Sequence, residues 1–191
     1  MKRASLIIAA LLVLALSGCG SAKTTHPASV NNVSGTETIR AAITGAKAAK
    51  FLASNSSKPL VFPAFVFTGV VVTRTGRLPL GGPETGTHTF VTPAGNLVVK
   101  HTNGNKGGGK PTWVKAGGRC YFRQVATTGT YTDTGGTGSF AEAAGHGVFS
   151  LTVTASAKLL PGKTKCSSKN TGKPEAPAEI VFAASGPLTV R

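Results

Sequence analysis

Acidic residues are scarce in this sequence of 191 residues, which contains six Asp and Glu against 21 Lys and Arg. Most glycosidases use two carboxyl groups that flank the scissile bond. Three of the acidic residues fall in a predicted tail, a turn and a loop, namely Glu37, Glu84 and Glu175. The other three lie near predicted strands, namely Asp133, Glu142 and Glu179. A paired-carboxylate site for glycoside chemistry is therefore not expected.

Common catalytic motifs are also missing. The sequence has no GxSxG, HExxH or CxxC motif, which removes the usual support for a serine hydrolase, a zinc protease or a thiol oxidoreductase. Residues 104–110 fit the GxxxxGK spacing of a phosphate-binding loop, but Pro111 replaces the Ser or Thr that would hold magnesium. We therefore expect no cofactor and no metal centre, and a binding protein is favoured over an enzyme.

No apolar run is long enough for a membrane span. The longest, residues 6–16, has eleven residues and follows Lys2 and Arg3, whereas a spanning helix needs about 20. This pattern predicts a signal peptide over residues 1–18. The residues Leu-Ser-Gly-Cys that end at Cys19 resemble a bacterial lipobox. That resemblance implies a diacylglyceryl group on Cys19 and a location on the extracytoplasmic face of the cell membrane, the alternative being an ordinary secretory signal.

Two cysteines remain, Cys120 and Cys166. An even pair in an exported chain predicts a disulfide. It would close a loop of about 47 residues, for which the chain-entropy model gives about 4 kcal/mol of stabilisation. The alternative is two free or metal-binding thiols, although neither cysteine belongs to a CxxC or His-Cys cluster.

The sequence divides into a tether and a strand-rich domain. Residues 19–58 are interpreted as a lipid-anchored tether, in which Ser34 and Glu37 have the spacing of a capping box and predict a helix over 35–53. This helix would lie on anionic headgroups or pack against one end of the following domain. Residues 59–191 are interpreted as the β-domain.

Alternating apolar and polar residues predict strands throughout 59–191. After Gly147 the odd positions from Phe149 onward are apolar and the even positions are polar, which is the period of a strand with one buried face. About eight such strands follow one another in meander order. We predict an all-β fold, a small antiparallel β-barrel of about eight strands, because closure removes exposed edges. A two-sheet sandwich is the alternative.

The stretch 131–151, YTDTGGTGSFAEAAGHGVFSL, contains an aromatic residue, GGTG, Phe140 and then Ala144-Gly145 before a long strand. This pattern resembles the signature of the dirigent and allene oxide cyclase barrels and of bacterial secreted proteins built like them. The resemblance covers residues 129–153. It implies a barrel that holds a reactive hydrophobic intermediate with a few polar groups to steer it. Catalytic residues do not carry over, because there is no residue-by-residue match outside the glycine motif.

A predicted hairpin over residues 87–102 carries two histidines. With a turn at 93–96, the symmetrical register pairs Phe90 with Val99 and His88 with His101. Neighbouring imidazoles suit an acid–base pocket, although they are fewer than the ligands of a zinc site. His88, His101 and Arg123 are therefore candidate catalytic residues; otherwise the two histidines are polar residues at a barrel mouth.

Basic residues gather on both sides of the predicted disulfide, and the net charge is +15. The candidates for a joint basic surface are Lys100, Lys106, Lys110, Lys115, Arg119, Lys163, Lys165 and Lys169. Such a surface attracts anionic lipid or an anionic cell-envelope polymer. Nucleic acid is not expected as a partner, since no recognition motif is present.

These observations predict a lipid-anchored extracytoplasmic barrel that binds a small apolar ligand or an anionic envelope component. The alternative is a dirigent-like or cyclase-like isomerase that acts in the barrel interior. A barrel interior filled with phenylalanine rings would argue against both small-molecule functions. The rings in question belong to Phe65, Phe67, Phe90, Phe149 and Phe182.

Overall fold

The structure is a computed structural model that describes residues 32–54, 60–75, 78–80, 85–104 and 108–191. The segment predicted as a signal peptide, Cys19, the first part of the predicted tether, Glu84 and Lys106 lie outside the described residues. Among the described residues, no helix has the length and apolar character needed to cross a membrane.

Strands make up most of the described chain. The main sheet contains β1 (Val33–Thr44), β3 (Phe65–Thr68), β4 (Thr73–Thr75), β6 (Thr85–Thr92), β7 (Gly95–Asn103), β8 (Thr112–Ala116), β9 (Arg119–Gly136), β10 (Ala144–Lys158) and β11 (Glu175–Val190). A two-stranded sheet is formed by β2 (Leu60–Phe62) and β5 (Leu78–Leu80). The helices are α1 (Gly45–Ala53) and a short 3-10 turn, η1 (Gly138–Phe140).

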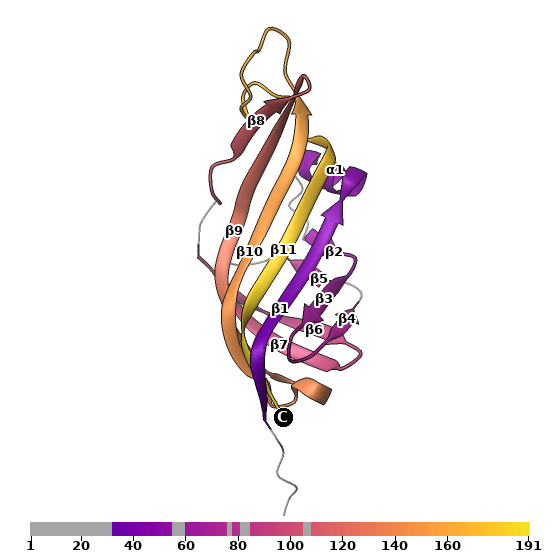
Figure 1. Cartoon of the computed structure of the whole chain (residues 1–191), viewed down its shortest axis with the longest axis vertical. Coiled ribbons are helices and arrows are strands. Elements are labelled where there is room, and N and C mark those ends of the chain that lie inside the picture. Colours follow the sequence, from indigo (N-terminus) through magenta and orange to yellow (C-terminus); the bar gives the residue numbers. More distant parts are fainter. Residues whose placement is uncertain (1–31, 55–59, 76–77, 81–84, 105–107) are drawn as a thin grey trace, which may run out of the picture. The chain divides into compact units, whose positions relative to one another are not determined.

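The main sheet is antiparallel and strongly curled, so that it forms a half-barrel. Its order is β4-β3-β1-β11-β10-β9-β7-β6, and β8 continues beside β9 where β7 does not reach. The long strands β9, β10, β11 and β1 lie side by side and curve together (Figure 1). The all-β prediction is confirmed in this form, and the curled single sheet replaces the sandwich alternative.

The predicted helix over 35–53 is wrong in its first half, because residues 33–44 form β1. Buried residues alternate along this strand, as Glu37, Ile39, Ala41 and Ile43 show, and alternation is the period of a strand. β1 pairs with β11 on one side and β3 on the other. The strand-rich domain therefore begins near Val33 and not at residue 59.

The helical part of the prediction holds only for α1. Ala48 and Ala49 are buried, and α1 packs against β11 and β1. Of the two predicted placements, the structure has the helix packed against the sheet. The exposed Lys47 and Lys50 stay on its outer side.

The β6–β7 hairpin has a different register from the predicted one. Thr92 pairs with Gly95, so the turn contains two residues and not four. The Thr92 hydroxyl donates to the Gly95 carbonyl oxygen (2.8 Å) and accepts from the Ala94 N–H (3.1 Å), which closes this tight turn. Gly95 has φ 130°, a conformation that other residues rarely adopt. Because the shift is two residues, the side chains stay on the predicted faces, and His88 is opposite Val99.

Phenylalanine rings fill part of the inner face, which is the face of the main sheet that carries the buried residues. Phe65, Phe67 and Phe90 pack edge to face with centroids 5.2–5.7 Å apart. Phe149 and Phe182 form a second contact at 6.1 Å. These contacts argue against a wide, open barrel interior.

Candidate functional site

Acidic, imidazole and phenol side chains gather on the inner face. We name five of them the inner polar row: Glu37, His88, His101, Tyr131 and Asp133. Strand register brings them together, because Tyr131 on β9 is opposite His101 on β7. Asp133 is opposite Val99, which in turn is opposite His88 on β6. The row therefore joins residues that are far apart in the sequence.

Glycines on β10 make room for the row. Tyr131 is opposite Gly147, and Asp133 is opposite Gly145. A Cβ atom at Gly147 would lie 2.6 Å from the Tyr131 hydroxyl oxygen, and one at Gly145 would lie 2.5 Å from Asp133 Oδ2. The phenol and the carboxyl group thus occupy the space that side chains at these two positions would need. This close approach explains the Gly-His-Gly pattern of residues 145–147.

Two carboxyl groups of the row are buried with incomplete hydrogen bonding. Glu37 and Asp133 are 3% and 7% exposed. Glu37 Oε2 accepts a hydrogen bond from the Val71 N–H at 3.2 Å. Glu37 Oε1 and Asp133 Oδ1 have no hydrogen-bond partner in the described part of the chain. Ionising such groups is costly, because burial removes water without supplying donors in its place.

This environment changes the acidity of the carboxyl groups. Burial raises the pKa of Asp133 to about 6, although the positive charge of His146 acts in the opposite direction. Burial also raises the pKa of Glu37, a shift that the Val71 and Val70 N–H groups reduce and the charge of Asp133 increases. Asp133 is therefore positioned to exchange a proton near neutral pH.

Tyr131 remains a hydrogen-bond donor throughout the physiological range. Burial, followed by the charges of Asp133 and Glu37, raises its pKa to about 12. The neutral phenol keeps its O–H. It supplies a donor near two carboxyl groups that each have one oxygen without a hydrogen-bond partner.

The two histidines form a stacked pair at the less buried end of the row. Their ring centroids are 4.7 Å apart with an interplanar angle of 21°, and the His101 ring meets the Phe149 ring edge to face at 6.1 Å. Burial and then the charge of His101 lower the pKa of His88. The predicted side-by-side placement is confirmed, whereas a catalytic role stays a prediction. Within the described residues, no group of three or more His, Cys, Asp or Glu could hold a metal ion.

Arg123 is not part of this row. It is exposed on β9, opposite Thr154 and Thr112. Eight residues separate it from Tyr131 along the strand, which corresponds to roughly 26 Å. Arg123 instead lines a shallow groove of about 370 Å³. The other lining residues are Tyr121, Phe122, Thr154, Ala155, Pro177, Ala178 and Glu179.

The disulfide between Cys120 and Cys166 is present, as predicted. It fastens the start of β9 to the loop between β10 and β11. The Lys115 ammonium, on β8, donates to the Thr164 carbonyl oxygen at 3.3 Å, so the two basic segments do meet. Lys163, Lys165 and Lys169 lie in the same loop and are exposed.

The basic-surface prediction is wrong for Lys100 and Lys110, which do not lie beside the disulfide. Lys100 lies on β7 opposite Thr132 of β9, twelve residues along the strand from Cys120 and thus roughly 40 Å away. Lys110 lies between these two places, since its neighbour Gly109 bonds to the Val125 carbonyl oxygen. The basic surface is therefore confined to the end of the sheet that holds the disulfide.

No family model, curated protein or solved structure matches this chain. The resemblance to dirigent and allene oxide cyclase barrels therefore stays a prediction.

The sequence interpretation missed three residues of the row, Glu37, Tyr131 and Asp133. Glu37 was missed because its segment was interpreted as a helix. Tyr131 and Asp133 carried a usable signal, because positions 129, 131 and 133 alternate with threonines that are exposed. Their shared period of two places both polar groups on the buried face.

Proposed function

We propose that the protein binds a small, mostly apolar molecule at the inner polar row. The observation that carries this proposal is the pair of buried carboxyl oxygens, Glu37 Oε1 and Asp133 Oδ1, that lack partners. Buried polar groups in native proteins are nearly always hydrogen-bonded. Departures from this rule concentrate at functional sites. A ligand that brings hydroxyl or amide donors would complete the hydrogen bonding.

The surroundings favour a ligand with an apolar body. Phe90 and Val99 are buried on the same face as the row, and Phe149 is partly exposed beside His101. Apolar walls with a few converging polar groups are typical of small-molecule sites. Because packed phenylalanines occupy neighbouring space, the ligand must be small.

Native mass spectrometry tests this proposal. The protein from Ser21 onward is exported in a bacterial host and kept free of detergent. We expect an adduct that organic solvent extracts, and its loss in the double variant Tyr131→Phe/Asp133→Asn. Thr132→Ala is the matched control, since Thr132 is exposed between these residues, and it should keep the adduct. A bare wild-type mass, two hydrogens short for the disulfide, would contradict the proposal.

The alternative function, an isomerase that moves a proton on the bound molecule, is supported by the pKa of about 6 at Asp133. A group with this pKa can both accept and donate a proton at neutral pH. The extracted molecule, returned to the wild-type protein in deuterated water, should then gain deuterium at a carbon atom. Asp133→Asn should abolish this exchange while retaining some adduct. Equal exchange in both proteins would exclude Asp133 as the acid–base group.

The lipobox that ends at Cys19 supports attachment to the extracytoplasmic face of the membrane. A lipid anchor would keep the binding domain beside the bilayer, where small apolar molecules concentrate.

A further inference from the structure

The loop over residues 159–174 is an ordered extension of the sheet end (Figure 1). Two backbone hydrogen bonds close it at its base, from Leu160 N–H to the Asn170 oxygen and from Gly172 N–H to the Lys158 oxygen, both 2.9 Å. The Asn170 side chain donates to the Lys165 carbonyl oxygen at 3.0 Å. Together with the disulfide, these bonds fix the backbone from which its lysines project.

This end of the sheet, which we name the basic tip, has seven basic residues and one acidic residue in segments 113–121 and 158–175. The basic residues are Lys115, Arg119, Lys158, Lys163, Lys165, Lys169 and Lys173. All of them except Arg119 are exposed. The concentration of one sign of charge creates a positive potential over a small surface.

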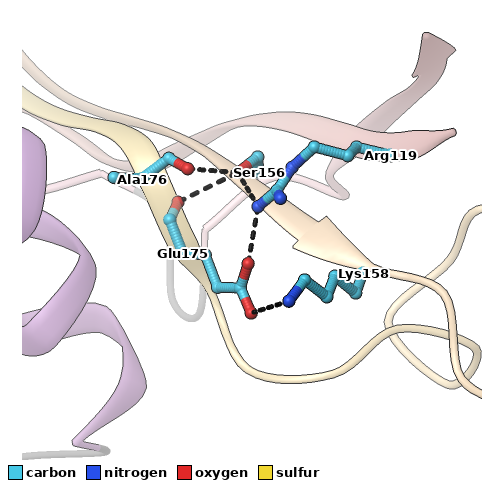
Figure 2. A network of polar contacts seen from close by, with 5 residues as sticks. All are labelled: Arg119, Ser156, Lys158, Glu175 and Ala176. Atoms are coloured by element: carbon cyan, nitrogen blue, oxygen red, sulfur yellow. Dashed lines mark hydrogen bonds and ion pairs between the residues drawn. The ribbon is translucent and has the colours of Figure 1, made fainter. Parts of the chain in front are cut away.

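The single carboxylate, Glu175, is already engaged (Figure 2). Arg119 donates to Glu175 at 2.6 Å and to the Ser156 hydroxyl at 3.0 Å. Lys158 lies 4.0 Å from the other Glu175 oxygen. The buried Ser156 hydroxyl donates to the Ala176 carbonyl oxygen at 2.9 Å. This network ties together the ends of β9, β10 and β11, so Arg119 has a structural role.

Four lysines of the loop are available to pair with anionic groups of another molecule. In the part of the chain that the structure describes, their ammonium groups have no ion pair or hydrogen bond. These are Lys163, Lys165, Lys169 and Lys173. Exposed lysines on an ordered loop suit a series of anionic groups spread along a chain, since no buried donors converge on one anion.

The basic tip lies at one end of the main sheet. Val33 pairs with Val190 at one end of the sheet, whereas the tip lies at the other end, beyond Lys158 of β10. Strand β10 runs from residue 144 to 158, which corresponds to roughly 45 Å. The tip is therefore far from the end of the sheet at which β1 begins.

We propose that the basic tip docks the protein onto a linear polyanion of the cell envelope that carries phosphate or carboxylate groups. This function is separate from ligand binding at the inner polar row. Neutralising lysine–phosphate contacts releases counterions, so binding weakens with salt. With four lysines and a slope of about −0.7 each, affinity should fall about 50-fold between 50 and 200 mM salt.

The experiment uses the full mature protein in nanodiscs of neutral phosphatidylcholine, with inorganic polyphosphate as the probe. Affinity is measured by calorimetry over this range of salt. The double variant Lys163→Gln/Lys165→Gln should bind at least tenfold more weakly at 50 mM salt, with a shallower slope. The matched control is Arg40→Gln/Lys100→Gln, because these residues are exposed and lie outside the tip. It should change affinity less than about threefold.

Two outcomes would overturn the proposal. Equal losses in the two double variants would mean that net charge, and not the tip, determines binding. Absence of polyphosphate binding, together with binding to vesicles that contain phosphatidylglycerol, would mean that the tip contacts a membrane surface. Circular dichroism of each variant verifies that the fold is retained.

Discussion

Replacing Asp133 by Asn should stabilise the protein at neutral pH. The pKa of Asp133 rises from an ordinary 3.8 to about 6 on folding. Each unit of such a difference corresponds to about 1.4 kcal/mol, so the ionised carboxylate costs up to about 3 kcal/mol. Asn has nearly the same shape and no charge to desolvate. Above pH 6 the free energy of unfolding should therefore increase by up to about 3 kcal/mol.

The raised pKa of Asp133 determines how the stability difference between variant and wild type changes with pH. Because the folded state holds the Asp133 proton more tightly, this group favours folding fully below about pH 4. The contribution is lost as the pH rises through about 6. The difference in unfolding free energy between variant and wild type should thus be small at pH 4 and reach its maximum near pH 7.

Urea unfolding followed by circular dichroism, at pH values from 4 to 8, measures this difference. For a domain of about 160 residues, 3 kcal/mol corresponds to roughly 6–12 °C in melting temperature. Glu142→Gln is the control, since Glu142 is exposed and pairs with Arg191 at the surface; its effect should stay below about 1 kcal/mol. A difference for Asp133→Asn that is the same at pH 4 and pH 7 would refute the reasoning.

Three further predictions concern other parts of the molecule. Gly147→Ala should destabilise the fold by more than about 2 kcal/mol, because the new Cβ would lie 2.4 Å from the Ser185 oxygen and 2.6 Å from the Tyr131 hydroxyl oxygen. Gly172→Ala is the control and should be tolerated, because its Cβ would have no contact closer than 3.8 Å. Equal losses of stability in urea titrations of the two variants would contradict the crowding argument. Replacing both disulfide cysteines by serine should lower the unfolding free energy by about 4 kcal/mol, and an unchanged urea midpoint would contradict this. Cys19→Ser should abolish incorporation of radiolabelled palmitate by growing cells, and continued labelling would disprove the proposed anchor at Cys19.

Local sequence patterns were sufficient to predict the all-β fold class and the disulfide. From Phe149 to Lys158 every second residue is apolar, and this segment lies in β10, where Val153, Ala155 and Ala157 are buried. The shared face of His88 and His101 also followed from a period of two, although the register was wrong by two residues. A two-residue error leaves faces unchanged, which explains why the histidines are nevertheless neighbours.

The wrong secondary-structure prediction arose where the local sequence fits both a helix and a strand. In residues 35–44 the small and β-branched apolar residues Ile39, Ala42 and Ile43 satisfy a helical spacing, while Ile39, Ala41 and Ile43 satisfy a strand spacing. Only the pairing of β1 with β11 and β3 decides between them, and this pairing involves residues far away in the sequence. Glu37 was missed as a member of the inner polar row for the same reason, since it reaches the row only through β1.

The central place of β1 affects how the protein is made. A chain is synthesised from its amino terminus, yet Val33–Thr44 pairs along its whole length with β11, which ends at Val190. One side of β1 must therefore remain unpaired until β11 has been synthesised. Such long-range pairing slows folding and leaves strand edges exposed to aggregation in the meantime. Loss of even the last dozen residues would remove most of the β11 partners of β1, so a truncated product should fail to fold.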